Sequence, residues 1–135
     1  MIVSTRGRYA LRILIELAEL GDAGLVPMKT IAERQELSLK YLERILPVLT
    51  QNGIVEGTQG KGGGYRLCRK PEELTVWEIL RLTEGELAPV SCLECGAEPC
   101  ARLETCRTQK MWSGFHDHIR SYFEAITLRD LMQEG

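Results

Sequence analysis

The 135-residue sequence predicts a mainly helical fold with one small β-hairpin and a long C-terminal helix. Three observations support this prediction. Apolar residues recur at steps of three and four along the segments before residue 53, which is the period of an amphipathic helix. Two short apolar segments then flank a glycine-rich run, as in a hairpin. The last stretch, residues 108–132, returns to the helical period.

The first three helices are expected at residues 5–20, 28–35 and 39–52. Pro27 suits the start of the second helix, because its fixed φ angle is already helical. Ser38 precedes the third helix and can accept a hydrogen bond from the amide of Lys40 or Tyr41 as an N-cap. Pro47 lies inside the third helix, so we expect a bend or a loosened turn there.

A β-hairpin is expected after the third helix. Its strands are residues 54–56 and 65–67, and the glycine-rich residues 57–64 join them. That composition suits an extended tip, since glycine adopts backbone angles that other residues avoid. Cys68 follows an apolar strand and is expected to be a small core residue.

The C-terminal half is expected to hold two further helices and a loop. Thr75 can cap a helix at residues 76–83. Residues 92–106 contain glycine and proline and show no periodicity, so we expect a loop. Residues 108–132 are expected to form one helix. Its apolar face is too long for a small domain to cover, so we expect it to pack against its counterpart in a second subunit.

The order helix, helix, short turn, helix, hairpin is that of a winged helix-turn-helix domain. The sequence therefore predicts three parts. A winged helix-turn-helix DNA-binding domain occupies residues 1–85, a cysteine-rich loop residues 86–107, and a dimerisation helix with a tail residues 108–135.

Charge is distributed unevenly along the chain. The net charge is −2, but residues 1–70 carry 11 Lys/Arg and 7 Asp/Glu, a balance of +4, and residues 71–135 carry 6 and 12, a balance of −6. Only the first part can meet a polyanion. The sequence has neither a long apolar stretch nor a signal peptide, so we expect a cytoplasmic protein without membrane contact.

The third helix and the hairpin tip carry the candidate DNA contacts. A recognition helix reads base edges in the major groove with its first residues. The expected contacts there are Ser38, Lys40, Tyr41, Glu43 and Arg44. Lys40 and Arg44 share one face and can grip phosphate or guanine, whereas Glu43 can accept from cytosine or repel a wrong sequence. At the tip, Gln59, Gly60 and Lys61 are slim enough for a minor groove.

Two enzymatic interpretations of the sequence are disfavoured. The glycine-rich run lacks the Walker spacing and is not followed by a helix, which argues against a nucleotide site. The pair Cys92-x2-Cys95 resembles a thiol oxidoreductase motif, but that motif normally opens a helix next to a strand. We therefore expect a protein that is not an enzyme.

Four of the five cysteines lie within fifteen residues: Cys92, Cys95, Cys100 and Cys106. Their thiolates favour soft metals, namely zinc or iron–sulfur clusters. The spacing matches neither a ferredoxin nor a zinc ribbon. An iron–sulfur cluster, zinc, a thiol switch and uncoordinated cysteines therefore all remain open on spacing alone.

Four segments carry a resemblance to a known family: residues 4–10, 31–35, 38–43 and 60–65. Together with the cysteine loop and Trp112, they resemble the IscR/NsrR/CymR-type family of bacterial winged-helix regulators over nearly the whole chain. The resemblance implies a homodimer formed through the long C-terminal helix, which binds palindromic double-stranded DNA operators.

The same resemblance implies an iron–sulfur cluster, with [2Fe–2S] favoured over [4Fe–4S], held by Cys92, Cys100 and Cys106. Gln109 stands where the branch that regulates cluster biogenesis has a histidine. The fourth ligand can therefore be Gln109, Cys95 or a residue of the partner subunit's N-terminal helix. The implied role is regulation of iron–sulfur cluster biogenesis or a response to iron, redox or nitric oxide status. A branch that senses cysteine supply lacks the cysteine triad, so this chain does not resemble that branch.

Overall fold

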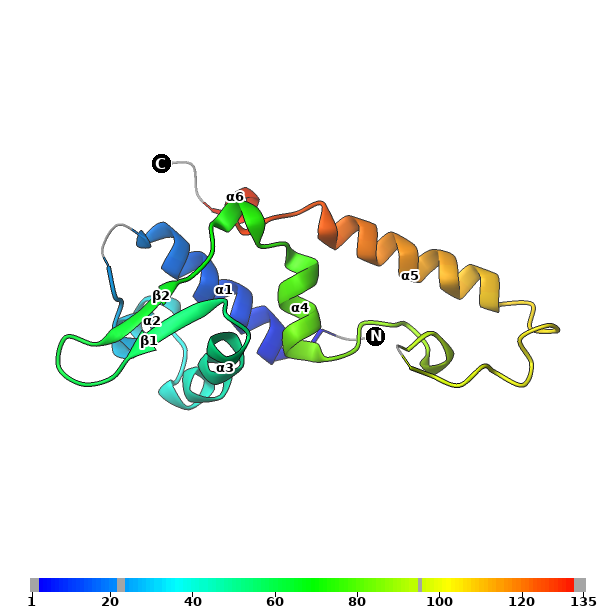
Figure 1. Ribbon diagram of the computed structural model, residues 1–135, viewed down its shortest axis with the longest axis horizontal. Helices are drawn as coiled ribbons and strands as arrows, with labels where there is room; N and C mark the ends of the chain where they lie inside the picture. Colours follow the sequence, from blue (N-terminus) through cyan, green and yellow to red (C-terminus); the bar gives the residue numbers. More distant parts are fainter. Residues whose placement is uncertain (1–2, 22–23, 95, 133–135) are drawn as a thin grey trace.

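The computed structural model describes residues 3–21, 24–94 and 96–132, and its elements follow the predicted order (Figure 1). The helices are α1 (Thr5–Glu19), α2 (Met28–Gln35), α3 (Leu39–Gln51), α4 (Val76–Glu84), α5 (Gln109–Glu124) and α6 (Leu128–Leu131). The strands are β1 (Val55–Thr58) and β2 (Gly64–Leu67). The expected hairpin is thus confirmed, with slightly longer strands and a link of residues 59–63.

Helix α1 lies at the centre of the fold. It contacts α2, α3, α4, α6 and β2, while Arg6, Arg8 and Arg12 remain exposed to solvent. Ala10, Ile13 and Leu14 are completely buried in the core cluster. Burying an aliphatic side chain contributes about 1.5–3 kcal/mol, so this helix organises much of the stabilising apolar contact.

A buried carboxylate connects α1 to α2. The side chain of Glu16 is only 7% exposed. It accepts hydrogen bonds from the Arg34 guanidinium and, at 2.7 Å, from the side-chain amide of Gln35. Arg12 donates to the backbone and side-chain oxygens of the same Gln35. The end of α2 is therefore fixed to α1 by polar contacts at the turn that leads into α3.

Both predicted helix caps are confirmed. The Ser38 hydroxyl accepts from the Tyr41 amide at 3.4 Å, and the Thr75 hydroxyl accepts from the Glu78 amide at 3.1 Å. Each satisfies a backbone donor that has no partner within its own helix. Helix α3 continues through Pro47, which is exposed on its outer side.

The hairpin is anchored along the outer side of β2 by a third extended segment. Val26 and Tyr65 exchange two backbone hydrogen bonds of 2.8 Å. A Cβ on the neighbouring Gly64 would lie 2.5 Å from the Val26 carbonyl, and that contact is with backbone. Glycine is therefore required for this approach, which holds the hairpin beside α2.

The C-terminal segment differs from the single helix expected at residues 108–132. Helix α5 ends at Glu124, and α6 begins after Thr127. Thr127 and Asp130 form a capping box, in which the hydroxyl accepts from the Asp130 amide at 3.3 Å and the carboxylate accepts from the Thr127 amide at 2.9 Å. A local cap therefore outweighs the continuing apolar period.

The segment after α5 joins the core of the N-terminal domain. Leu128 is completely buried, and its amide donates to the Leu74 carbonyl at 2.9 Å. The Val76 amide donates to the Ile126 carbonyl at 2.8 Å. Helix α5 projects away from this core, and the cysteine loop lies toward its far end (Figure 1).

The burial of Leu128 gives a stability prediction. Leu128→Ala is expected to lower the free energy of unfolding by about 2–5 kcal/mol, because it leaves a cavity in the core. The matched control is Leu131→Ala, three residues along the same helix, where the side chain is 41% exposed. The control should change stability by no more than about 0.5 kcal/mol. Urea unfolding at fixed protein concentration measures both, and equal effects would contradict the docking of α6.

Candidate nucleic-acid interface and cysteine loop

Helix α3 presents one buried and one exposed face. Its buried stripe consists of Leu42, Ile45, Leu46 and Leu49. Lys40, Glu43 and Arg44 are exposed on the opposite side. Neither Lys40 nor Arg44 has an ion-pair partner among the described residues. Their charges are therefore available to an anion, as the sequence predicts.

Tyr41 is held in place by an aromatic contact. Its ring meets the Tyr9 ring edge-on, with centroids 5.2 Å apart, and the Arg12 guanidinium lies 5.4 Å from the centre of the Tyr9 ring. Tyr41 is still 41% exposed. One side of the ring is thus fixed while the other faces solvent. Tyr9 was not predicted as part of the site, although its place one turn before Ile13 on α1 is compatible with this role.

The hairpin forms the wing. Gly60 and Gly62 have φ angles of 96° and 80°, and the Gly63 amide donates to the Gly60 carbonyl at 3.0 Å. Gln59, Gly60 and Lys61 are all exposed at the tip. Below the tip, Glu56 and Arg66 form an ion pair across the two strands. The charges of this pair cancel in the two strands, which form the stem of the wing. The net charge of the wing therefore comes from Lys61.

The described part of the cysteine loop presents three thiols with different exposure. Cys92 and Cys100 are exposed, and Cys106 is half-buried. Among residues 3–21, 24–94 and 96–132, no group of three or more His, Cys, Asp or Glu side chains is placed to hold a metal ion. The donor chemistry suits an iron–sulfur cluster, since thiolates are its usual ligands. Cys95 lies outside the described residues.

Cys106 differs from the other loop thiols in its surroundings. Its sulfur lies 3.6 Å from the Thr108 hydroxyl, and Arg102 is nearby. The hydrogen bonds from Thr108, with a smaller contribution from Arg102, lower the pKa of the Cys106 thiol below its ordinary value. Thiolate formation is thereby favoured at the loop's end, where Gln109 begins α5.

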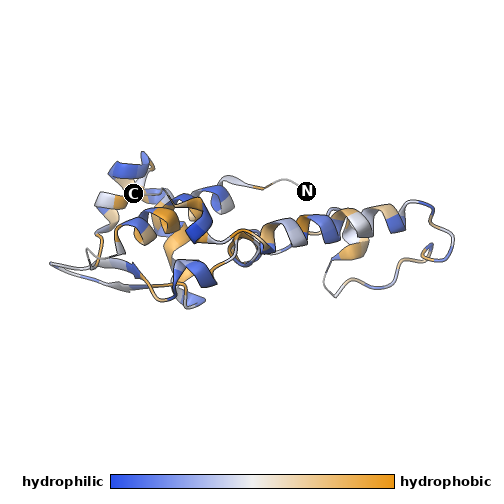
Figure 2. Ribbon diagram, turned by 90° about the horizontal axis from the view of Figure 1, so that it is seen from above, coloured by the Kyte–Doolittle hydropathy of each residue, from blue (hydrophilic) through white to orange (hydrophobic). Residues whose placement is uncertain are grey.

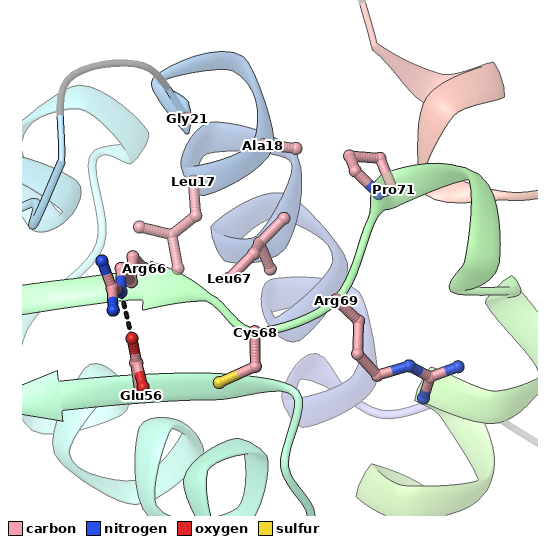
Figure 3. A pocket seen from close by; sticks show the side chains of 9 residues that line it. All are labelled: Leu17, Ala18, Gly21, Glu56, Arg66, Leu67, Cys68, Arg69 and Pro71. Atoms are coloured by element: carbon pink, nitrogen blue, oxygen red, sulfur yellow. Dashed lines mark hydrogen bonds and ion pairs between the residues drawn. The ribbon is translucent and has the colours of Figure 1, made fainter.

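The expectation that Cys68 is a core residue is wrong. The residue is exposed beside a hollow between α1 and the wing stem, which Arg66 and Arg69 also line (Figure 3). It follows β2 at the edge of the hairpin, so no second layer covers it. Partial burial and the charge of Glu56 raise the pKa of its thiol, which disfavours thiolate formation.

Helix α5 carries a large uncovered apolar face. None of its residues is buried, and Met111, Phe115 and Tyr122 are 55%, 48% and 65% exposed. Apolar segments recur along this projecting helix (Figure 2). Trp77 of α4 contacts the His116 ring edge-on at 6.1 Å and connects the inner side of the helix to the core. Within the described residues, no helix is both long and apolar enough to cross a membrane.

Comparison with known sequences gives full-length matches. The model of the Rrf2 family, described as an iron-dependent transcriptional regulator, matches residues 3–134. The protein rrf2 of Nitratidesulfovibrio vulgaris is 36% identical, over 100% of this chain and 89% of the relative. The regulator IscR of Aliivibrio salmonicida is 34% identical, over 100% and 79%. The regulator CymR of Bacillus subtilis is 37% identical, over 97% and 89%.

Solved structures agree with these matches. The structure of CymR, described as the global cysteine regulator of B. subtilis, has a TM-score of 0.78 at 36% identity and covers 97% of this chain and 95% of its own. That of T. potens IscR has a TM-score of 0.75 at 31% identity, covering 100% and 94%. IscR and CymR are named transcriptional regulators, and none of these relatives is named as an enzyme. The chain belongs to the Rrf2 family of DNA-binding transcription regulators.

Proposed function

We propose that this regulator is a homodimer that reads an operator with α3 and the wing, and that an iron–sulfur cluster on the cysteine loop controls its DNA binding. The exposed cations of α3, which form no ion pair among the described residues, and a wing that ends in Lys61 carry the DNA part of this proposal. Two such DNA-binding domains suit a palindromic operator, because each recognition helix enters one of two major grooves about 34 Å apart.

The dimer proposal is supported by the apolar face of α5. Phe115, Ile119 and Tyr122 line a hollow of about 370 Å³ along this face. Leaving such a surface in water is costly, and a second copy of the helix can cover it at a helix-crossing angle. The two DNA-binding domains are then joined by the helices that also carry the cysteine loops.

The cluster proposal is supported by donor chemistry and by the IscR relatives. Cys92, Cys100 and Cys106 would be the ligands, with Gln109, Cys95 or a residue of the partner as the fourth. When bound, a cluster supplies sensitivity to iron and oxidants. The chain itself connects the cysteine loop to the DNA-binding domain, because the loop runs from the end of α4 to the start of α5.

A second candidate is a loop that binds zinc or works as a thiol redox switch. The exposed thiols of Cys92 and Cys100 suit either kind of chemistry, and the match to CymR, named the global cysteine regulator of B. subtilis, also supports this candidate. The lowered pKa of the Cys106 thiol also suits thiolate chemistry of either kind. The same DNA-binding face serves both candidates.

The DNA-reading face is tested by two substitutions. Arg44→Ala and Lys61→Ala are each expected to weaken binding by about 1–3 kcal/mol, because each removes a cation from the groove-facing surface. Removing a phosphate contact should reduce the salt dependence, whereas removing a base contact should relax sequence preference. Fluorescence anisotropy with a duplex selected from a random-sequence pool measures both.

Arg129→Ala is the charge-matched control for this test, since Arg129 is exposed on α6, away from α3 (Figure 1). It should bind like the unaltered protein. If all three variants bind equally well, the assignment of α3 and the wing to the DNA grooves is wrong.

Dimerisation through α5 is tested by Phe115→Glu. A carboxylate in the middle of an apolar contact would have to be desolvated without a partner, so the dimer should dissociate. Light scattering after gel filtration is expected to give a monomer's mass. Glu124→Gln, at the exposed end of the same helix, should leave the dimer intact. A dimer that persists in Phe115→Glu would place the subunit contact elsewhere.

The cluster is tested by the colour and metal content of anaerobically purified protein. Visible absorption with iron and sulfide is expected, and Cys106→Ser should abolish it. Cys68→Ser should not, because Cys68 lies outside the loop. A colourless protein with stoichiometric zinc would instead favour the zinc site. A metal-free protein with unchanged folding would favour the thiol switch.

A further inference from the structure

A small hollow lies between the start of α1 and the exposed side of α3. It has a volume of about 210 Å³ and is lined by Ser4, Thr5, Arg6, Tyr41, Arg44 and Ile45. Two of these residues are arginines on different helices, Arg6 on α1 and Arg44 on α3. Neither the Arg6 nor the Arg44 guanidinium forms a hydrogen bond or an ion pair within the described part of the chain.

We propose that Arg6 and Arg44 together form a phosphate-contacting site for the DNA backbone, and that Glu84 holds this site in position. The inference rests on the proposed DNA-binding face, because the hollow is continuous with it through Tyr41 and Arg44. A helix that enters a major groove has a sugar–phosphate backbone on either side, and contacts to that backbone set the register of the protein. Guanidinium groups suit phosphate oxygens, which they can bind in pairs.

Glu84 fixes the segment that carries Arg6. One carboxylate oxygen, Oε1, accepts from the Ser4 hydroxyl at 2.7 Å and from the amides of Ser4 and Gly7 at 3.1 Å each. A Cβ on Gly7 would lie 2.4 Å from that same oxygen. The absence of a side chain at Gly7 therefore allows the carboxylate to approach, and α1 is tied to α4 on both sides of Arg6.

Glu84 also lies next to the start of the segment that leads to the cysteine loop. It is the last residue of α4, and Gly85 with a φ angle of 82° follows it. The Glu86 carboxylate then accepts from the amides of Leu87 and Ala88 at 2.9 and 3.0 Å, at the start of the segment that leads to Cys92. The segment that leads to Cys92 therefore begins directly after the carboxylate that positions Arg6.

Arg6→Ala is expected to reduce the slope of log affinity against log salt by about 0.9 for each phosphate that the variant no longer neutralises, or about twice that for a dimer. Arg6→Lys should restore most of the slope. The control is Arg8→Ala, which removes the same charge from the same helix but points away from the hollow, since residues two apart on a helix face different ways. The slope is measured by anisotropy between about 50 and 200 mM salt.

Equal slopes for Arg6→Ala and Arg8→Ala would overturn the phosphate site. The DNA affinities of Arg44→Ala and Lys61→Ala show whether only the phosphate site fails or the whole DNA-binding face. If those variants bind more weakly while Arg6→Ala does not, only the present inference fails. If none of them binds more weakly, the DNA-binding face itself is wrong.

The positioning role of Glu84 has its own test. Removing a carboxylate should strengthen DNA binding if net charge alone matters. We expect the opposite for Glu84→Ala, with the same reduction in slope as in Arg6→Ala and no further reduction in the double variant. Glu84→Gln should keep the slope, because its amide oxygen can still accept from Ser4 and Gly7. Circular dichroism checks the folding of each variant, and tighter binding by folded Glu84→Ala, or a reduced slope in folded Glu84→Gln, would overturn the role.

Discussion

The contact of the buried Glu16 carboxylate with the end of α2 is the interaction on which the placement of α3 depends. Glu16 lies on the side of α1 that faces the core, so its charge must find partners inside the protein. Arg34 and Gln35 at the end of α2 are those partners. They stand directly before the turn at Glu36, whose φ angle of 53° redirects the chain into α3. The turn that leads into α3 is therefore tied to α1 by a polar contact at the edge of the apolar core.

The remainder of the DNA-binding domain follows from the same central helix. Tyr9 on α1 supports Tyr41, and Glu84 on α4 ties down the segment before Gly7. The wing attaches separately, through Val26 and Tyr65. Elements that carry the candidate DNA contacts are thus held by contacts on their inner sides, which leaves the cations of α3 exposed to solvent. The candidate DNA contacts of α3 are therefore side chains that the fold positions but that take no part in packing the core.

Local signals in the sequence predicted most of the fold. The caps at Ser38 and Thr75 and the glycine-rich wing depend on neighbours in the chain, and each appears where it was expected. The break before Thr127 was missed because the apolar period continues across it. The exposure of Cys68 and the Ser4–Glu84 contact were missed because they depend on segments far apart in sequence. The arrangement of the loop thiols also could not be read from spacing, since loop connections allow many geometries.

The return of the chain at Leu128 has a consequence for how this molecule can evolve. The segment between α4 and α6, which comprises the cysteine loop and α5, leaves the packed core and re-enters it at Leu128, so both its ends are held by contacts outside the loop. Mutations, insertions or exchanged cysteines within it need not disturb the core. Under the proposed function, selection can therefore replace the stimulus that the loop senses while the rest of the fold is inherited unchanged.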